Sequence, residues 1–232
     1  MNTDNTTNKT SRLISKVLSP AVRLWLKSQV QQISQLEVQI AGSDRQILTG
    51  NIPRVSILAS QAVYQGLHIT QIQLEAQEIQ INLGQVIKGK PLRLLAKVPA
   101  SGNLYLTQAD LNASLASPLL ADALTDLFAK LFNGSLASKQ VSWQKTTIGS
   151  DLLRLEGILT SDRVPMPIVF QAGLQLASSH QLQILQPTLE MQSGEIVSID
   201  SFTVDLGAEV DIEKLSLDSG QIICSGRLNV LP

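Results

Sequence analysis

The sequence predicts an α+β fold in which a long, curved antiparallel β-sheet wraps around amphipathic helices. Apolar residues recur first at helical spacing and then at every second position, and this order of helix followed by strands occurs twice along the 232 residues. Apolar alternation also keeps one phase from Leu92 to Leu106, well beyond the usual strand of about five or six residues. Strands of that length are expected to curve around whatever the interior holds.

The composition indicates an aliphatic interior. Hydrophobic residues make up 44% of the chain, but aromatic residues only 3% and charged residues 16%, against about 25% charged residues in typical soluble domains. The core must therefore consist mainly of Leu, Ile, Val and Ala. A chain of this length can bury a large core in one domain. We expect a disordered polar segment over residues 1–10 and a single elongated domain over residues 11–232.

The first helix is predicted over residues 11–33. Ser19-Pro20 interrupts it, and the pair is typical of an N-cap serine followed by proline at the first helical position. The cations, which lie close to one row of this helix, are Arg12, Lys16, Arg23 and Lys27. Such a basic amphipathic helix suits a membrane interface, or a position on a sheet with its cations in water.

Strands are predicted over residues 36–106. The apolar alternation shifts phase near Thr70-Gln71 and again near Gln77-Glu78. Each shift moves the alternation by one residue. A β-bulge inserts one extra residue into a strand, so a bulge at each point would keep the apolar side facing inward. We therefore expect one long, strongly curved strand through both points, with a hairpin at either point as the alternative.

The second helix is predicted over residues 107–132. Thr107 to Asp110 begins it in the manner of a capping box. Ser117-Pro118 restarts it, as Ser19-Pro20 does in the first half, and Asn133-Gly134 ends it.

Further strands are predicted over residues 136–231. The longest alternating run extends from Val164 to Leu176. Pro165 and Pro167 lack the backbone N–H that a ladder needs, so the start of this run is expected to be an unpaired edge.

Catalytic and metal-binding patterns are missing from the sequence. His68 and His180 have no Cys, His or carboxylate neighbours at metal-ligand spacing. The chain contains no nucleophile elbow, Walker loop or dinucleotide fingerprint. Cys224, the single cysteine, alternates in phase with apolar residues and is expected to be buried as a small hydrophobe. We therefore expect no enzymatic activity, no cofactor and no metal site.

Charge is distributed unevenly along the chain. Residues 1–106 carry 11 Lys and Arg against 5 Asp and Glu, whereas residues 107–232 carry 7 against 14. A second basic group lies where a loop enters a predicted strand, and it consists of Lys88, Lys90, Arg93 and Lys97. These cations suit charge-assisted bonds to phosphate, or a plain solubilising loop. A nucleic-acid partner is not expected, because the pI is near 6.1 and no aromatic residues interleave with the cations.

Three segments carry a resemblance to a known family. They are Gly50-Asn51-Ile52 leading to Val55, then Gly66-Leu67 with Ile69, and above all Leu106 to Asn112 followed by Leu115 and Ser117-Pro118. On these residues the sequence resembles the bacterial LmeA-like phospholipid-binding family. The resemblance covers the middle of the chain best. It implies a fold similar to tubular lipid-binding domains, in which a curved sheet wraps a long helix around an apolar tunnel, and phospholipid binding without catalysis.

A lipid tail is held by non-directional burial, so its site needs an aliphatic lining. We expect the second helix to supply Leu115, Leu120, Leu124, Leu127, Phe128 and Leu131. We expect the strands to supply Ile72, Leu74, Ile79, Ile81, Leu94, Ile168 and Phe170. The same residues would also suit an ordinary closed core. Both basic groups, Arg12 to Lys27 and Lys88 to Lys97, are candidates for contact with head groups or a membrane surface.

The predicted function is non-catalytic binding of a phospholipid or a similar amphipathic lipid, in transport, sensing or maintenance of a membrane or envelope. The alternative is a structural or interaction module at a membrane surface, with a closed core and a protein partner. The polar residues 1–10 lead into no secretory apolar segment, and no run of residues is apolar over the length a spanning helix needs. We therefore expect a cytoplasmic protein with peripheral membrane contact.

Overall fold

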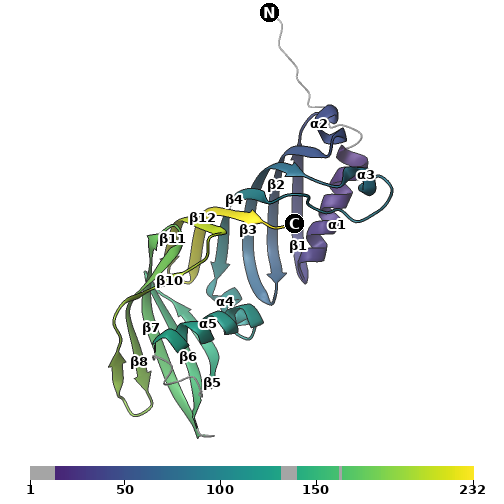
Figure 1. Ribbon diagram of the computed structural model, residues 1–232. Helices are drawn as coiled ribbons and strands as arrows, with labels where there is room; N and C mark the ends of the chain where they lie inside the picture. The colour runs from purple at the N-terminus through teal and green to yellow at the C-terminus, as the bar shows by residue number, and fades with distance from the viewer. Residues whose placement is uncertain (1–13, 132–139, 162–163) are drawn as a thin grey trace, which may run out of the picture.

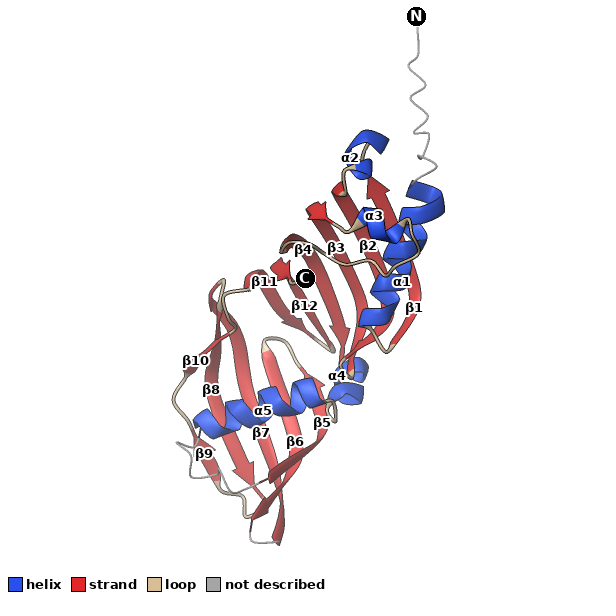
Figure 2. Ribbon diagram, turned by 45° about the vertical axis from the view of Figure 1, so that its right-hand side comes forward, coloured by secondary structure: helices blue, strands red, loops and turns tan. Residues whose placement is uncertain are grey.

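Two antiparallel β-sheets, each of six strands and each with a helix on one face, make up the computed structural model (Figures 1 and 2). The structure describes residues 14–131, 140–161 and 164–232. The α+β class and the antiparallel pairing are confirmed. The strands are divided between two sheets, which follow one another along an elongated molecule, so that each sheet is covered by a helix of its own.

The first sheet contains, in spatial order, β1 (Gln32–Ala41), β2 (Asn51–Tyr64), β3 (Leu67–Gln80), β4 (Val98–Thr107), β12 (Gln221–Val230) and β11 (Val210–Asp218). The second contains β10 (Phe202–Asp205), β8 (Gln181–Met191), β7 (Val164–Ser178), β6 (Leu152–Ser161) and β5 (Gln140–Ile148), with β9 (Ile196–Ser198) beside β8. β11 and β12 thus return to the first sheet after the second is complete. The two halves of the sequence are therefore not the two halves of the structure.

The first helix, α1 (Ser19–Gln29), lies on the first sheet and follows a π-helical turn at Ile14–Leu18. It ends earlier than predicted, because β1 already begins at Gln32. The prediction that Ser19 caps a new helix is wrong: Leu18 occupies the N-cap position with helical backbone angles, and no side chain caps the helix. Leu18 and Val22 are buried against the sheet, which satisfies the apolar face of the helix.

Four further helices follow: the short α2 (Asp44–Leu48), α3 (Leu83–Val86) and α4 (Gln108–Ser114), and the longer α5 (Pro118–Leu131). The predicted helix over residues 107–132 is thus two helices. Ser117 separates them, and its Oγ accepts a hydrogen bond from the backbone N–H of Leu120 at 3.2 Å. The predicted restart at Ser117-Pro118 is confirmed. α5 lies across the second sheet (Figure 2).

The long β3 strand is continuous, as predicted, but the bulges predicted for it are wrong. β2 and β3 pair in one unbroken register from Tyr64↔Leu67 to Asn51↔Gln80. Both strands change phase at the same two levels, where Gln61 and Glu78 have φ of 49° and 53°. A left-handed residue in one strand at each level keeps the apolar side inward, and the register is the same on both sides of it, so no extra residue is inserted.

The predicted run from Leu92 to Leu106 is interrupted. β4 begins only at Val98, and residues 87–97, here called the 87–97 segment, form no strand, although Leu94 makes an isolated antiparallel bridge with Ile81 just after β3. The run from Val164 is one long strand as predicted. Pro165 and Pro167 pair with β6, whereas β8 joins β7 only from Ile168. The start of β7 is therefore an edge on one side.

The core beneath α5 is closed by aromatic contacts. The Phe128 ring lies 4.9 Å from the ring of Trp143 and 5.3 Å from that of Phe170, centroid to centroid. Leu155, Leu159 and other aliphatic residues with about 2% exposure surround them. Tilted ring pairs at these distances are favourable beyond their burial, and they fill the space between α5 and the sheet.

Helix α4 joins the two sheets through hydrogen bonds from one short segment. Toward the second sheet, Asn112 accepts from the N–H of Thr146 at 2.6 Å and donates to its carbonyl at 3.0 Å. Gln108 also accepts from the N–H of Ile148 at 2.9 Å. Toward the first sheet, the Ser114 hydroxyl accepts from the N–H of His68 at 2.8 Å. These four hydrogen bonds from α4 side chains thus satisfy backbone groups of β5 and of β3, on both sides of the junction between the sheets.

The start of α4 is fixed by Asp110 and two threonines. Thr107 Oγ1 accepts from the N–H of Asp110 at 3.2 Å, as the predicted cap requires, and donates to its carboxylate at 2.6 Å. Thr70 Oγ1, on β3, also donates to that carboxylate. Partial burial opposes ionisation of Asp110, but the hydrogen bonds from Thr107 and Thr70 outweigh it and lower its pKa below the ordinary value of 3.8.

Replacement of Asp110 by asparagine should lower the free energy of unfolding at neutral pH by about 1 kcal/mol, because bonds to a charged, solvent-screened acceptor become bonds to a neutral one. Since the folded-state pKa is lowered, the carboxylate stabilises the fold above pH 3.8 and loses that contribution as the pH falls below it. Urea unfolding of both proteins, at neutral pH and near pH 3, should show a difference that shrinks at the lower pH. Asp126→Asn, at an exposed position on α5, serves as the control, and an Asp110→Asn difference that is equal at both pH values would contradict this account.

Candidate functional site

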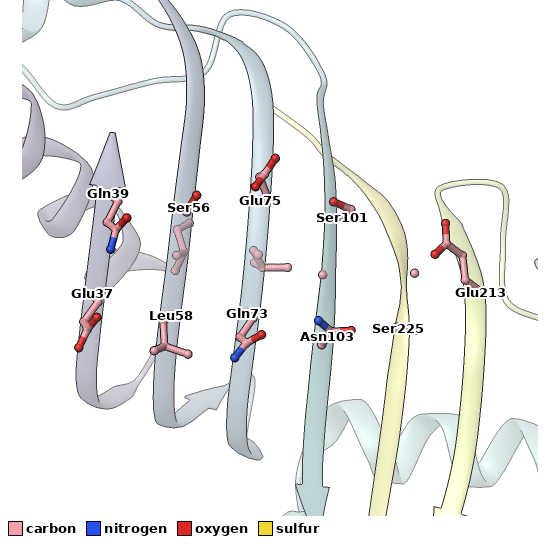
Figure 3. A pocket seen from close by; sticks show the side chains of 14 residues that line it. Glu37, Gln39, Ser56, Leu58, Gln73, Glu75, Ser101, Asn103, Glu213 and Ser225 are labelled. Carbon is pink, nitrogen blue, oxygen red and sulfur yellow. The ribbon is translucent and has the colours of Figure 1, made fainter. Parts of the chain in front are cut away.

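The first sheet has a hollow on each of its two faces. One is an apolar cavity of about 600 Å³ between α1 and the sheet. The other is a polar trough of about 540 Å³ on the opposite face (Figure 3). The two differ in chemistry, and this difference decides which of them suits a lipid.

The apolar cavity is walled by side chains from α1 and from four strands. α1 contributes Val22, Trp25 and Leu26, and the sheet contributes residues such as Val55 and Ala100. Among the described residues that line the cavity, none is an Asp, Glu, Lys or Arg; the polar groups are those of Gln29, Tyr64 and Asn229. Such a surface holds hydrocarbon without requiring a fixed polar partner.

Small residues create the space. Ala76 on β3 and Ala100 on β4 are direct partners in the ladder, and both line the cavity. Gly102 lies two residues beyond Ala100 on β4. A Cβ added there would lie 2.6 Å from Leu74 Cδ2 and 2.1 Å from the carbonyl oxygen of Gln73. The middle of the sheet therefore has short side chains on the face that α1 covers, and Leu74 occupies the room that Gly102 leaves.

The 87–97 segment forms another wall. Leu92 and Leu94 from this segment line the cavity. Asn82 holds the segment in place: its Oδ1 accepts from the N–H of Arg93 at 2.8 Å, and its Nδ2 donates to the carbonyl of Pro91 at 3.0 Å. Leu95 donates to the carbonyl of Gln80 at 2.9 Å. These bonds hold Leu92 and Leu94 against the cavity beside the end of β3, where Leu94 forms a single bridge with Ile81, and outside β4.

The structure separates the predicted lining residues into two groups. Leu74, Ile79, Ile81 and Leu94 line the apolar cavity. The residues in the closed core beneath α5 are Leu115, Leu120, Leu124, Leu127, Phe128, Ile168 and Phe170. Ile72 lies between them, in a small cluster around Ala62, Ile69 and Leu106. The side chain of Leu131 falls outside the described residues.

Sequence reasoning did not assign α1 or the end of β12 to the cavity. The α1 residues Val22, Trp25 and Leu26 and the β12 residues Leu228 and Val230 all line it. The helical periodicity of α1 was a usable signal, because that apolar face had to pack on something. The contribution of β12 had no local signal, because it depends on the pairing of β12 with β4.

The predicted cations flank the cavity on two sides. Lys16, Arg23 and Lys27 are exposed along α1 and the turn before it. Lys88, Lys90 and Arg93 are exposed on the 87–97 segment, which runs beside α1 in both views (Figures 1 and 2). Lys97 instead pairs with Glu209, Nζ to Oε1 at 2.6 Å. The hydrogen bond from Lys97, and then one from Asn229, lower the pKa of Glu209. Arg12 falls outside the described residues.

Large apolar side chains are exposed on the same elements. Leu24 on α1 is 72% exposed, and Ile87 and Leu95 on the 87–97 segment and Leu231 after β12 are each more than half exposed. Single exposed apolar residues are ordinary. Here four of them lie on the three elements that bound the cavity, beside six exposed cations.

The polar trough has the opposite character. Figure 3 shows amides, hydroxyls and carboxylates from neighbouring strands, among them Glu37, Gln73, Glu75 and Glu213. Two of these acids form surface ion pairs with arginines, Glu75 with Arg54 at 3.6 Å and Glu213 with Arg227 at 2.8 Å. A surface of amides, hydroxyls and partly ion-paired carboxylates offers little to an acyl chain, so the apolar cavity is the candidate lipid site.

The described residues hold no group of three or more His, Cys, Asp or Glu side chains that could bind a metal ion. Burial raises the pKa of the Cys224 thiol, so the thiolate, which is the nucleophilic form, is disfavoured at neutral pH. Within the described part of the chain, no helix is both long enough and apolar enough to cross a membrane.

Comparison with known proteins gives one match. A family model described as LmeA-like phospholipid-binding matches residues 9–227. No curated protein matches the sequence, and no solved structure matches the fold.

The cavity makes a testable prediction about packing. Ala100→Leu places added carbon atoms in open apolar space, so it should raise the free energy of unfolding by up to about 2 kcal/mol. Ala62→Leu, in the closely packed cluster with Ile69 and Leu106, should lower it by about 1–3 kcal/mol. Chemical unfolding of the two variants measures the contrast. Equal destabilisation by both substitutions would mean that no such space exists.

Proposed function

The chain belongs to the LmeA-like phospholipid-binding family, and from this premise we propose that it binds the acyl part of a phospholipid, without catalysis, in the cavity beneath α1. The observation that carries the proposal is an aliphatic cavity of about 600 Å³ whose described lining includes no charged residue. Each methylene transferred from water to such a lining contributes about 0.8 kcal/mol. A tail of ordinary length therefore supplies enough free energy for stable binding.

The basic residues beside the cavity suit the other end of the molecule. A phosphate group on a lipid whose tail enters the cavity would lie near α1 and the 87–97 segment, where Arg23, Lys27 and Lys90 are exposed. Ammonium and guanidinium groups form strong charge-assisted hydrogen bonds with phosphate oxygens. The predicted head-group role is proposed for these cations. Lys97 is expected to contribute less to head-group binding, because it already forms an ion pair with Glu209.

The same surface suits peripheral contact with a membrane. Exposed leucines such as Leu24 and Leu95 would enter the interface, while the neighbouring cations would face anionic head groups. This orientation brings the cavity toward the bilayer, as extraction or release of a lipid requires. We propose a carrier or sensor on these grounds. A cytoplasmic location stays a prediction.

The alternative, an interaction module with a closed core, is favoured by the second sheet alone. There Phe128, Trp143 and Phe170 fill the space beneath α5, so the predicted lining residues of that region are proposed to stabilise the fold. The cavity beneath α1 distinguishes the two functions, because a module that only binds a protein partner has no use for it.

A carboxylate at the cavity should abolish lipid binding. Leu228→Glu places a charge among the lining residues at a position already 39% exposed, so the fold should survive. The cost of desolvating the charge against an acyl chain should weaken binding at least about tenfold. Binding of a fluorescent phospholipid, and mass spectrometry of lipid extracted from the purified protein, measure the effect. Leu152→Glu, at a position 41% exposed on β6, is the matched control; an equal loss in both variants would refute the assigned site.

Charge reversal should separate membrane contact from tail binding. The triple change Arg23→Glu, Lys27→Glu and Lys90→Glu should weaken sedimentation with vesicles containing phosphatidylglycerol. Since each cation near an anionic surface contributes about 1 kcal/mol, the loss should exceed about a hundredfold at low salt. Lys145→Glu on β5, which is exposed away from this surface, should change sedimentation little. Unchanged vesicle binding of the triple variant would count against the proposed orientation.

A further inference from the structure

We infer that the cavity receives one acyl chain per lipid and limits the length of that chain. The inference rests on the proposed function and adds the class of ligand: an amphiphile with a single aliphatic chain and an anionic head group is the molecule that the protein shelters completely. Three features of the first sheet carry it, namely the volume of the cavity, its closed end away from α4 and the chemistry of its surroundings.

The volume suits one chain. A methylene group is about as large as a water molecule, which occupies about 30 Å³ in the liquid. The cavity of about 600 Å³ therefore holds about 20 methylene-sized groups. That is about one acyl chain of the length that spans a leaflet, and well short of two.

Toward α4, packed side chains fill the sheet beneath the cavity, while the exposed residues Gln29, at the end of α1, and Tyr64, at the end of β2, line its open side. On β3, Leu74 lines the cavity, whereas Ile72, one step nearer α4 on the same face, belongs to the packed cluster. On β4, Ala100 lines the cavity and Leu104, the ladder partner of Ile72, belongs to that cluster. The apolar space therefore does not continue into the core beneath α5.

The opposite end of the cavity is closed. Ile47 is fully buried, Ile52 is 1% exposed and Leu83 is 3% exposed, and all three belong to the core cluster that adjoins the cavity. Protein interiors packed to this degree lose free energy when extra carbon atoms are forced into them. A chain that is longer than the space must therefore leave its last carbons outside.

A second acyl chain has only partial shelter. Leu228 and Leu231, on β12 and just beyond it, are exposed beside the cavity and offer a second chain an open apolar surface. In solution the second chain of a diacyl lipid would remain largely in water. At a membrane it could stay in the bilayer while the first chain enters the protein.

A series of monoacyl phosphatidylglycerols and of free fatty acids with increasing chain length tests the inference, below their micelle-forming concentrations and with the full-length protein. Affinity, measured by displacement of a fluorescent fatty acid, should rise about fourfold per added methylene. The rise should stop near the length that fills the cavity, about 18–20 carbons. If the basic residues hold the phosphate, the phosphatidylglycerol series should bind more tightly than fatty acids at every length. In both series, the expected result is a break, that is, a chain length beyond which the affinity no longer rises.

Two substitutions in the cavity should lower the chain length at which the affinity stops rising. Ala100→Leu and, on the neighbouring strand, Ala76→Leu each fill part of the cavity, so each should shorten the longest accommodated chain by about three carbons. Ala113→Leu, at an exposed position on α4, should leave it unchanged. Circular dichroism and thermal unfolding establish that each variant is folded, and the two independent cavity positions guard against a local effect of one substitution.

The outcomes separate this inference from the proposed function. Affinity that rises without a break, or a diacyl phosphatidylglycerol that binds in solution with the added gain of its second chain, would overturn the single-chain inference and leave lipid binding intact. A break that does not move in either cavity variant would place the chain elsewhere and overturn the inference as well. No binding of any lipid would overturn the proposed function itself.

Discussion

The hydrogen bonds of α4 are the constraint on which the arrangement of the molecule depends. Asn112 and Gln108 satisfy the edge of β5, while Asp110 and Ser114 bind groups of β3. Backbone groups at the junction of two sheets would otherwise need water or go unpaired, at a cost comparable to a lost hydrogen bond each. Gly66 adds to this fixation, since an added Cβ there would lie 2.8 Å from the Cβ of Ser117. One heptapeptide and one tight turn thus set how the two sheets meet.

The two helix-covered sheets use their apolar residues differently. Beneath α5, the ring of Phe128 contacts those of Trp143 and Phe170, and these rings fill the layer between helix and sheet. Beneath α1, alanines occupy the centre of the sheet, and the side chains of the helix leave an apolar space over them. An empty apolar space forgoes dispersion contacts and costs stability. The two sheets therefore differ in how completely the layer between helix and sheet is packed.

Much of the fold follows from local signals, and much of the site does not. Thr107 and Ser117 predict their caps correctly, and alternation finds β3 and β7 because one face of each is buried. The position of Leu92 and Leu94 depends on Asn82, ten or more residues away, whose side chain binds their segment beside the end of β3. The cavity itself is lined both by α1 and by β12, which are distant parts of the chain. Periodicity shows which side chains face inward, but only tertiary packing decides whether Phe128 fills a space or Ala100 leaves one.

The return of β11 and β12 to the first sheet has a consequence for how the protein is made. β12 lies between β4 and β11 and contributes Leu228 and Val230 to the cavity, although more than a hundred residues of chain separate it from β4. During synthesis the first sheet therefore waits, with its apolar face incomplete, until the whole second sheet has left the ribosome. Contacts so distant in sequence make folding slow and leave apolar surface exposed in the meantime. The nascent chain accordingly has most need of a chaperone, or of a lipid, at the half that was translated first.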